Sequence, residues 1–181
     1  MTNGRGLFRQ SKKIIPKFEP AWGRGQTYSV ILSKKLTMTG PIKETINIGS
    51  IQLNFFLDGE DTNGAMTVFE FIVQPKAKVP AHHFHVAVDE LLYVLEGTVT
   101  QTVGENVLEL QPGDKCFIPR GTVHGFTNEH AIPFKVFCVL SPASIGPAYF
   151  REIGEVVNAG GPPDIQRVLA VMRRHGLEPV K

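Results

Sequence analysis

Short apolar runs separated by turn residues occupy most of this chain. The runs lie at residues 28–33, 44–48, 51–57, 66–73, 91–95, 98–103, 115–118, 123–126 and 134–140. Glycine-containing pairs such as Asp58-Gly59 and Asn63-Gly64 stand between them. Many short strands at a spacing of about 8 to 12 residues, with no helical period between them, predict an antiparallel β-sandwich or β-barrel.

The pattern changes after Ser141-Pro142. Residues 149–158 have a weak helical pattern, and residues 164–175 have a clear one whose apolar positions follow the i, i+3, i+4, i+7 rule: Ile165, Val168, Leu169 and Met172. We expect this apolar stripe to pack on the outside of the barrel or on a neighbouring subunit. A lid over a pocket is the alternative.

The first 27 residues hold six Lys/Arg and one acid, Glu19. This composition predicts an arm without regular structure. Ile14, Ile15, Phe18 and Trp22 favour an arm that wraps over the barrel or a second subunit, and a basic tail for an anionic partner is the other interpretation. The expected organisation is an N-terminal arm at 1–27, a β-barrel at 28–142 and a C-terminal helical extension at 143–181.

Composition excludes several classes of function. A net charge of +2 in 181 residues gives no support for nucleic acid as a partner. We expect no membrane span, because no apolar run approaches about 18 to 20 residues. The N-terminus lacks the apolar region of a secretory signal, so the cytoplasm is the expected location. Cys116 and Cys138 lie in strand-like runs, which predicts buried thiols in a reducing compartment.

Two groups of residues supply the candidate chemistry. The first is His83-Phe84-His85, followed after four residues by Glu90 and after six more by Gly97. The second runs from Gly113 through Pro119, Gly121 and His124 to Asn128. Three imidazoles and one carboxylate form a donor set that a divalent first-row transition metal prefers. The predicted ligands are therefore His83, His85, Glu90 and His124, and Glu90 is also the candidate catalytic base. A site that has lost its metal is the competing interpretation.

Strand geometry explains how these residues could meet. Residues two apart in a strand point to the same side, so His83 and His85 aim at one point while Phe84 faces away. We expect Val86–Asp89 to turn the chain so that Glu90 opens the next strand of a hairpin. A second hairpin is expected to bring His124 opposite the first three ligands.

Neighbouring polar residues receive other roles. His82 is the second choice for the position of His83, because a β-bulge at this His-His pair would exchange the two. Surface roles suffice for His130 and His175. Pro112-Gly113-Asp114 predicts a hairpin turn, and Asn128 is expected to cap a turn through its own backbone rather than touch substrate.

The two groups resemble the motifs of the cupin superfamily, in its small single-domain members. The second cupin motif is matched completely, by the residues Gly113, Pro119, Gly121, His124 and Asn128. The first is matched from His83 onward, with Ala77 where the leading glycine belongs and one extra residue before His83. Within the superfamily, residues 93–97 and 149–153 look like bacterial quercetin-dioxygenase-like proteins.

This resemblance implies an all-β fold, an antiparallel jelly-roll barrel with the metal inside, and a homodimer. The metal could be Fe, Mn, Ni, Zn, Co or Cu, and the partner is a small-molecule substrate. The foremost hypothesis is a metal-dependent dioxygenase acting on a small organic molecule, with aromatic and enolic compounds as the candidates. By alternation from Glu90 and His124, Leu92, Val94, Phe126 and Val136 are expected either to line the pocket or to fill the core. A metal-dependent isomerase or lyase, and a ligand-binding protein without catalysis, are the alternatives.

Overall fold

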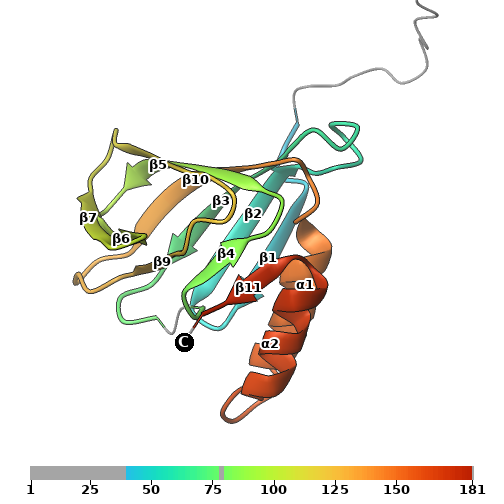
Figure 1. The fold of residues 1–181 in the computed structure, drawn as a ribbon. Coiled ribbons are helices and arrows are strands. Elements are labelled where there is room, and N and C mark those ends of the chain that lie inside the picture. Colours follow the sequence, from blue (N-terminus) through green and yellow to red (C-terminus); the bar gives the residue numbers. More distant parts are fainter. Residues whose placement is uncertain (1–39, 78–79, 181) are drawn as a thin grey trace, which may run out of the picture. The chain divides into compact units, whose positions relative to one another are not determined.

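The computed structural model describes residues 40–77 and 80–180. Within them the chain forms eleven strands and two helices (Figure 1). The strands are β1 (Glu44–Ile48), β2 (Ile51–Leu57), β3 (Thr67–Val73), β4 (His83–His85), β5 (Asp89–Glu96), β6 (Val99–Val103), β7 (Asn106–Leu110), β8 (Lys115–Ile118), β9 (His124–Thr127), β10 (Phe134–Ser141) and β11 (Leu177–Pro179). The helices are α1 (Pro147–Val157) and α2 (Ile165–Arg174). The arm at 1–27 and the strand expected at 28–33 lie outside the described residues.

Two antiparallel sheets make up the fold, as the sequence predicted. The six-stranded sheet has the order β1-β2-β3-β10-β5-β8, and the five-stranded sheet has the order β11-β4-β9-β6-β7. This is the expected all-β jelly roll with a helical C-terminal extension.

Alternating side chains build the core between the sheets. Along β10, Phe134, Val136, Cys138 and Leu140 are buried, while the residues between them are more exposed. Every second residue of a strand faces the same side, so this alternation places one face of β10 against the opposite sheet. Aromatic rings from β2, β3, β9 and β10 meet there, with centroids 5.1 to 6.2 Å apart.

The turn between β5 and β6 depends on glycine. Gly97 has φ +71°, and a Cβ atom there would lie 2.4 Å from the carbonyl oxygen of Pro133. Only glycine fits that combination of backbone angle and close approach. The turn therefore passes tightly under the start of β10 and carries the chain from one sheet to the other.

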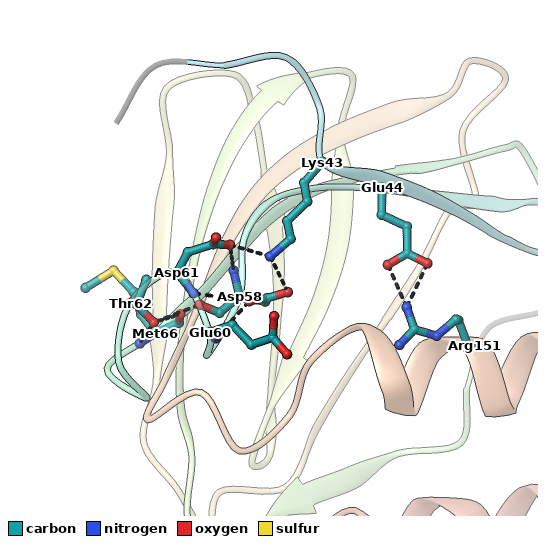
Figure 2. Close-up of polar contacts among 8 residues, drawn as sticks. All are labelled: Lys43, Glu44, Asp58, Glu60, Asp61, Thr62, Met66 and Arg151. Atoms are coloured by element: carbon teal, nitrogen blue, oxygen red, sulfur yellow. Dashed lines mark hydrogen bonds and ion pairs between the residues drawn. The ribbon is translucent and has the colours of Figure 1, made fainter. Parts of the chain in front are cut away.

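Helix α1 is held against β1 by polar contacts. Arg151 donates two hydrogen bonds to the Glu44 carboxylate, at 2.8 and 2.7 Å, as Figure 2 shows. Asn158 accepts a bond from the amide of Gly49 and donates one to the carbonyl of Asn47. Lys43, just before β1, contacts Asp58 and Asp61 on the loop after β2, at 2.7 Å each (Figure 2). The contacts of Arg151 and Asn158 fix the helix from which Tyr149 and Phe150 reach the barrel interior.

Helix α2 packs on α1 and β11, and its buried residues are Val171 and Met172. Of the predicted stripe, Met172 is buried, Val168 and Leu169 are partly buried, and Ile165 is 60% exposed. The stripe thus faces the outside of the barrel, which is the first of the two roles considered. No helix among residues 40–77 and 80–180 is long and apolar enough to cross a bilayer.

Candidate metal centre

Three buried histidines converge between the two sheets. His83 and His85 lie on β4 with their rings on one side of the strand, and His124 begins β9, where it pairs directly with His83. Their ring centroids are 4.6 to 5.3 Å apart. One nitrogen from each ring lies within 4.8 Å of the others. This spacing suits three ligands of a single metal ion.

Backbone carbonyls orient two of these rings. Nδ1 of His83 lies 2.9 Å from the carbonyl oxygen of Ala81, and Nδ1 of His124 lies 2.9 Å from that of Thr122. A carbonyl only accepts hydrogen bonds, so each Nδ1 donates, and in the neutral form that binds a metal the ring has its lone pair on Nε2. Such a bond on the far nitrogen is the usual support of a metal-binding histidine.

Glu90 comes from the facing sheet. Its Oε2 lies 3.2 Å from Nε2 of His124 and 3.8 Å from Nδ1 of His85, and its side chain is only 13% exposed. Burial alone would raise the pKa of Glu90, but the His124 hydrogen bond and the charges of His85 and His124 lower it to about 2. Glu90 is therefore ionised at neutral pH.

The environment keeps two of the imidazoles neutral. Burial lowers the pKa of His85 to about 4, and burial together with His124 lowers the pKa of His83. Burial also acts to lower the pKa of His124, but its bond to Glu90 outweighs this and raises that pKa. Neutral imidazoles and an ionised carboxylate are the forms that bind a metal, so the donor set fits a divalent transition ion.

Both halves of the motif cross between sheets, which corrects the expectation of two hairpins. β4 belongs to the five-stranded sheet and β5 to the six-stranded one, and β8 and β9 are divided in the same way. Pro112-Gly113-Asp114 likewise joins β7 to β8 of the other sheet, so it is a turn but not a hairpin. The crossing explains why the four side chains meet inside the barrel.

The two crossing loops are bonded to each other beside the histidines. Arg120 donates to both carboxylate oxygens of Asp89, at 3.0 and 2.7 Å, and its amide donates to the same side chain. The amide of Gly121 donates to the carbonyl of His85 at 2.8 Å. These bonds hold the loop after β8 against the ends of β4 and β5.

The remaining histidines lie outside the cluster. His82 is exposed, and its ring lies on the backbone of Gly125, where a Cβ atom would come within 2.1 Å of it. His83 and not His82 thus joins the other two imidazoles. His130 contacts Glu109 at 2.9 Å, and His175 contacts Glu152 at 3.0 Å. Both contacts are with carboxylates away from the cluster.

The histidines and Glu90 form part of the wall of a cavity of about 90 Å³. The rest of the wall is mainly apolar and aromatic: Ile51, Leu53, Phe69, Phe71, Pro80, Leu92, Gln101, Phe126, Leu140, Tyr149, Phe150 and Leu177. Leu92 and Phe126 were predicted to line it. Val94 and Val136 are buried in the core but do not line the cavity, because they lie farther along their strands from the histidines.

Several wall residues had no signal in the sequence. Tyr149 and Phe150 come from α1, and Leu177 comes from β11, which pairs with β4 in the register Leu177 to His85. Gln101 on β6 is 1% exposed, and its Oε1 has no hydrogen-bond partner among the described residues. Only the alternation of β6 could have placed this side chain inside.

Comparison with known proteins identifies the barrel. Residues 69–140, which run from within β3 to within β10 and hold all four candidate ligands, match the family model described as the cupin domain. This segment is a cupin domain. The resemblance read from the sequence motifs is thereby confirmed.

Individual relatives match parts of this chain. An uncharacterised protein of Methanocaldococcus jannaschii is 33% identical over 60 residues, 33% of this chain and 48% of that protein. Quercetin 2,3-dioxygenase of Bacillus subtilis is 32% identical over 81 residues, 45% of this chain and 23% of the enzyme. The chain thus spans about half of the first relative and about a quarter of the second. KdgF from Halomonas sp. is a similar solved structure, with TM-score 0.49, 21% identity and coverage of 55% of this chain and 87% of that one.

Proposed function

We propose that this cupin is a metal-dependent dioxygenase acting on a small organic substrate that is aromatic or enolic. His83, His85, Glu90 and His124 hold one divalent transition metal in this proposal. The observation that carries it is the convergence of three buried imidazoles and an ionised carboxylate on one aromatic-lined cavity. An apolar wall with a few convergent polar groups is typical of a small-molecule site.

The chain's own residues have distinct tasks in this proposal. When bound, the metal supplies a centre that polarises oxygen ligands and exchanges electrons with dioxygen. Glu90 accepts the proton of an enolic or phenolic hydroxyl, since its carboxylate is ionised and lies at the cavity wall. Phe71, Phe126 and Phe150 contact the planar part of the substrate and exclude water.

The size of the cavity favours a small substrate. An apolar cavity of about 150 Å³ accommodates benzene, whereas this cavity measures about 90 Å³. A three-ring flavonol therefore exceeds this cavity, and an open-chain enolic compound is the better candidate. The similarity to quercetin 2,3-dioxygenase supports the class of reaction, and it covers 23% of that enzyme.

The test combines metal analysis with dioxygen uptake. The purified protein is assayed for metal content and then for oxygen consumption on catechols, 1,3-diketones and flavonols. We expect uptake with a small member of the panel. It should fall about 100-fold or more in Glu90→Gln, since general base catalysis contributes about 10²–10⁴-fold, and disappear in His83→Ala.

His82→Ala is the matched control, because His82 is adjacent to His83 but lies on Gly125 outside the cluster. It should keep its metal and its activity. Turnover under strict anaerobiosis would contradict the proposed dioxygenase function and favour a metal-dependent isomerase or lyase. Stoichiometric binding of a ligand without turnover would favour a ligand-binding protein that has no catalytic activity.

We further propose a homodimer in the cytoplasm. Leu91, Tyr93, Leu95 and Phe117 lie on the outer face of β5 and β8 and are 38 to 60% exposed. Exposed apolar groups of this kind favour a protein interface, and a two-fold interface needs only one such surface per subunit. Light scattering should give twice the monomer mass, and Phe117→Glu should shift it toward the monomer. The buried free thiols Cys116 and Cys138 support a reducing compartment.

A further inference from the structure

The two oxygens of Glu90 have different surroundings. Oε2 faces the imidazoles of His124 and His85, at 3.2 and 3.8 Å. Oε1 faces the thiol of Cys138, whose sulfur lies 3.4 Å away. This buried thiol has no role in metal binding or proton transfer as proposed for the imidazoles and the carboxylate.

Sheet register places Cys138 at this oxygen. In the pairing of β10 with β5, Leu140 lies opposite Glu90, and Cys138 lies opposite Leu92. Positions two apart share a side of the sheet, so the thiol and the carboxylate both face the barrel interior as diagonal neighbours. Cys138 is 0% exposed, so no water competes for its contact with Glu90.

The thiol is the donor in this contact. A free thiol carries one S–H donor, and the Cys138 sulfur lies 3.4 Å from Oε1 of Glu90 with no exposure to solvent. An ionised carboxylate only accepts hydrogen bonds. Without the thiol, Oε1 would lose the one donor recorded for it among the described residues, and an unsatisfied buried acceptor is costly.

We propose that Cys138 is a positioning residue that holds Oε1 of Glu90, so that Oε2 is presented to the metal together with His85 and His124. The thiol acts through Glu90 and touches neither metal nor substrate. This inference rests on the proposed metal site and adds a residue outside the cupin motifs to it.

Cobalt(II) titration of purified apoprotein tests the proposal. Loss of a residue that supports a metal ligand typically weakens metal binding about 10- to 100-fold. Cys138→Ala should therefore bind Co²⁺ about tenfold more weakly and change the visible absorption of the bound ion. Cys138→Ser keeps a donor and should restore most of the affinity. Should Cys138→Ala fail to fold, Cys138→Val replaces the thiol's volume without a donor.

Cys116→Ala is the matched control. Strand β5 lies between β8 and β10, and Leu92 on β5 is paired with Cys116 on β8 and with Cys138 on β10. Cys116 is also buried. Among the contacts of the described residues it has no hydrogen bond to Glu90. Cys116→Ala also removes a buried thiol that is paired with Leu92. It should leave the Co²⁺ affinity and the visible spectrum of the bound ion unchanged.

A double-mutant cycle separates positioning from packing. In the Glu90→Gln background, Cys138→Ala should have less than a twofold effect on Co²⁺ affinity, because the ionised acceptor is gone. If Cys138→Ala lowers Co²⁺ affinity equally in the wild-type and Glu90→Gln backgrounds, Cys138 contributes only to core packing and the proposal is overturned. Wild-type affinity and spectrum in Cys138→Ala would do the same.

Crystal structures of the metal-free proteins keep this inference distinct from the proposed function. If the wild type binds no Co²⁺, the metal site fails, while the orientation of Glu90 is still measurable. The carboxylate should keep Oε1 at the thiol in the wild type and rotate in Cys138→Ala. An unchanged carboxylate in the variant overturns the role of Cys138 whatever the protein binds.

Discussion

Asn128 shows how a residue of the second cupin motif serves the fold rather than the chemistry. Its side chain is 1% exposed and donates to the carbonyls of Val73 and Ile132, at 2.9 and 3.0 Å. Its Oδ1 accepts from the amide of His130, which confirms the predicted turn cap. It is absent from the cavity wall.

Asn128→Ala should therefore lower stability without affecting the candidate metal centre. The buried carbonyl of Val73 and the partly buried carbonyl of Ile132 lose donors, at about 1–3 kcal/mol for an unsatisfied buried group. We expect the free energy of unfolding in urea to fall by about 2–4 kcal/mol with unchanged metal stoichiometry. Asn106→Ala, an exposed position on β7, is the control and should change it by less than about 0.5 kcal/mol. A stable variant that has lost its metal would contradict this division of roles.

His85 predicts the pH dependence of the metal-free protein. Its pKa is about 4 in the folded state against an ordinary 6.5, because burial disfavours the charged ring. Above pH 6.5 both states carry a neutral ring. Between pH 6.5 and 4 the unfolded chain binds the proton more readily, so stability falls as the pH falls.

The expected loss from His85 is about 3 kcal/mol between pH 7 and pH 4, at about 1.4 kcal/mol per pKa unit. Urea unfolding of apoprotein across this range measures it. His85→Asn should flatten the profile. A wild-type curve already flat between pH 7 and 4 would show that the ring is not protected from protonation.

At the residue scale, motif spacing predicted the cluster but not its surroundings. His83, His85, Glu90 and His124 could be found because strand periodicity and donor chemistry apply to local sequence. Cys138 could not, because its contact with Glu90 depends on the pairing of β10 with β5. That register forms only when the sheet assembles, so no pattern in the local sequence predicts the contact.

Among the elements, strands with strong alternation were predicted closely. β1, β2 and β8 have the predicted bounds, and β10 is one residue longer than predicted. β7 was missed because four of its five residues are exposed, so it lacks a buried face. β11 was missed because three residues ending in Pro179 have no strand signal, and their structure comes from pairing with β4.

Strand β11 also gives a test of how the chain's C-terminal segment supports the centre. Leu177 is 2% exposed, lines the cavity and lies opposite His85. Leu177→Ala should cost about 2–5 kcal/mol of stability, the range for truncating a buried leucine. It should also weaken metal binding, because β4 loses packing beside His85. Chemical denaturation and metal titration measure the two effects.

Glu178→Ala is the control for this element. Glu178 is partly exposed, and its contact in the described chain is an ion pair with Arg173 at 3.5 Å. Exposed pairs contribute about 0–1 kcal/mol. If both substitutions lower metal affinity equally, the strand pairing and not the Leu177 side chain is responsible.

At the scale of the whole molecule, metal binding should stabilise the fold. A ligand that binds only the native state at 100 times its Kd adds about 2.7 kcal/mol. For a domain of this size we expect a rise in Tm of about 5–10 °C over the chelator-treated protein. Differential scanning calorimetry with Mn²⁺, Fe²⁺, Ni²⁺ and Zn²⁺ measures it. His124→Ala should show no such rise, and equal shifts in both proteins would indicate binding elsewhere.

The direct pairing of His83 with His124 has a kinetic consequence. Residues so distant along the chain become neighbours only once the strands between them have found their places, and such non-local pairing comes late in folding. The four candidate ligands therefore do not form a metal-binding site during the early collapse of the chain. Stopped-flow measurements should show an unchanged refolding rate when metal is added, while unfolding slows in proportion to the stabilisation gained. The metal ion would stabilise the folded barrel against unfolding and would not nucleate its folding.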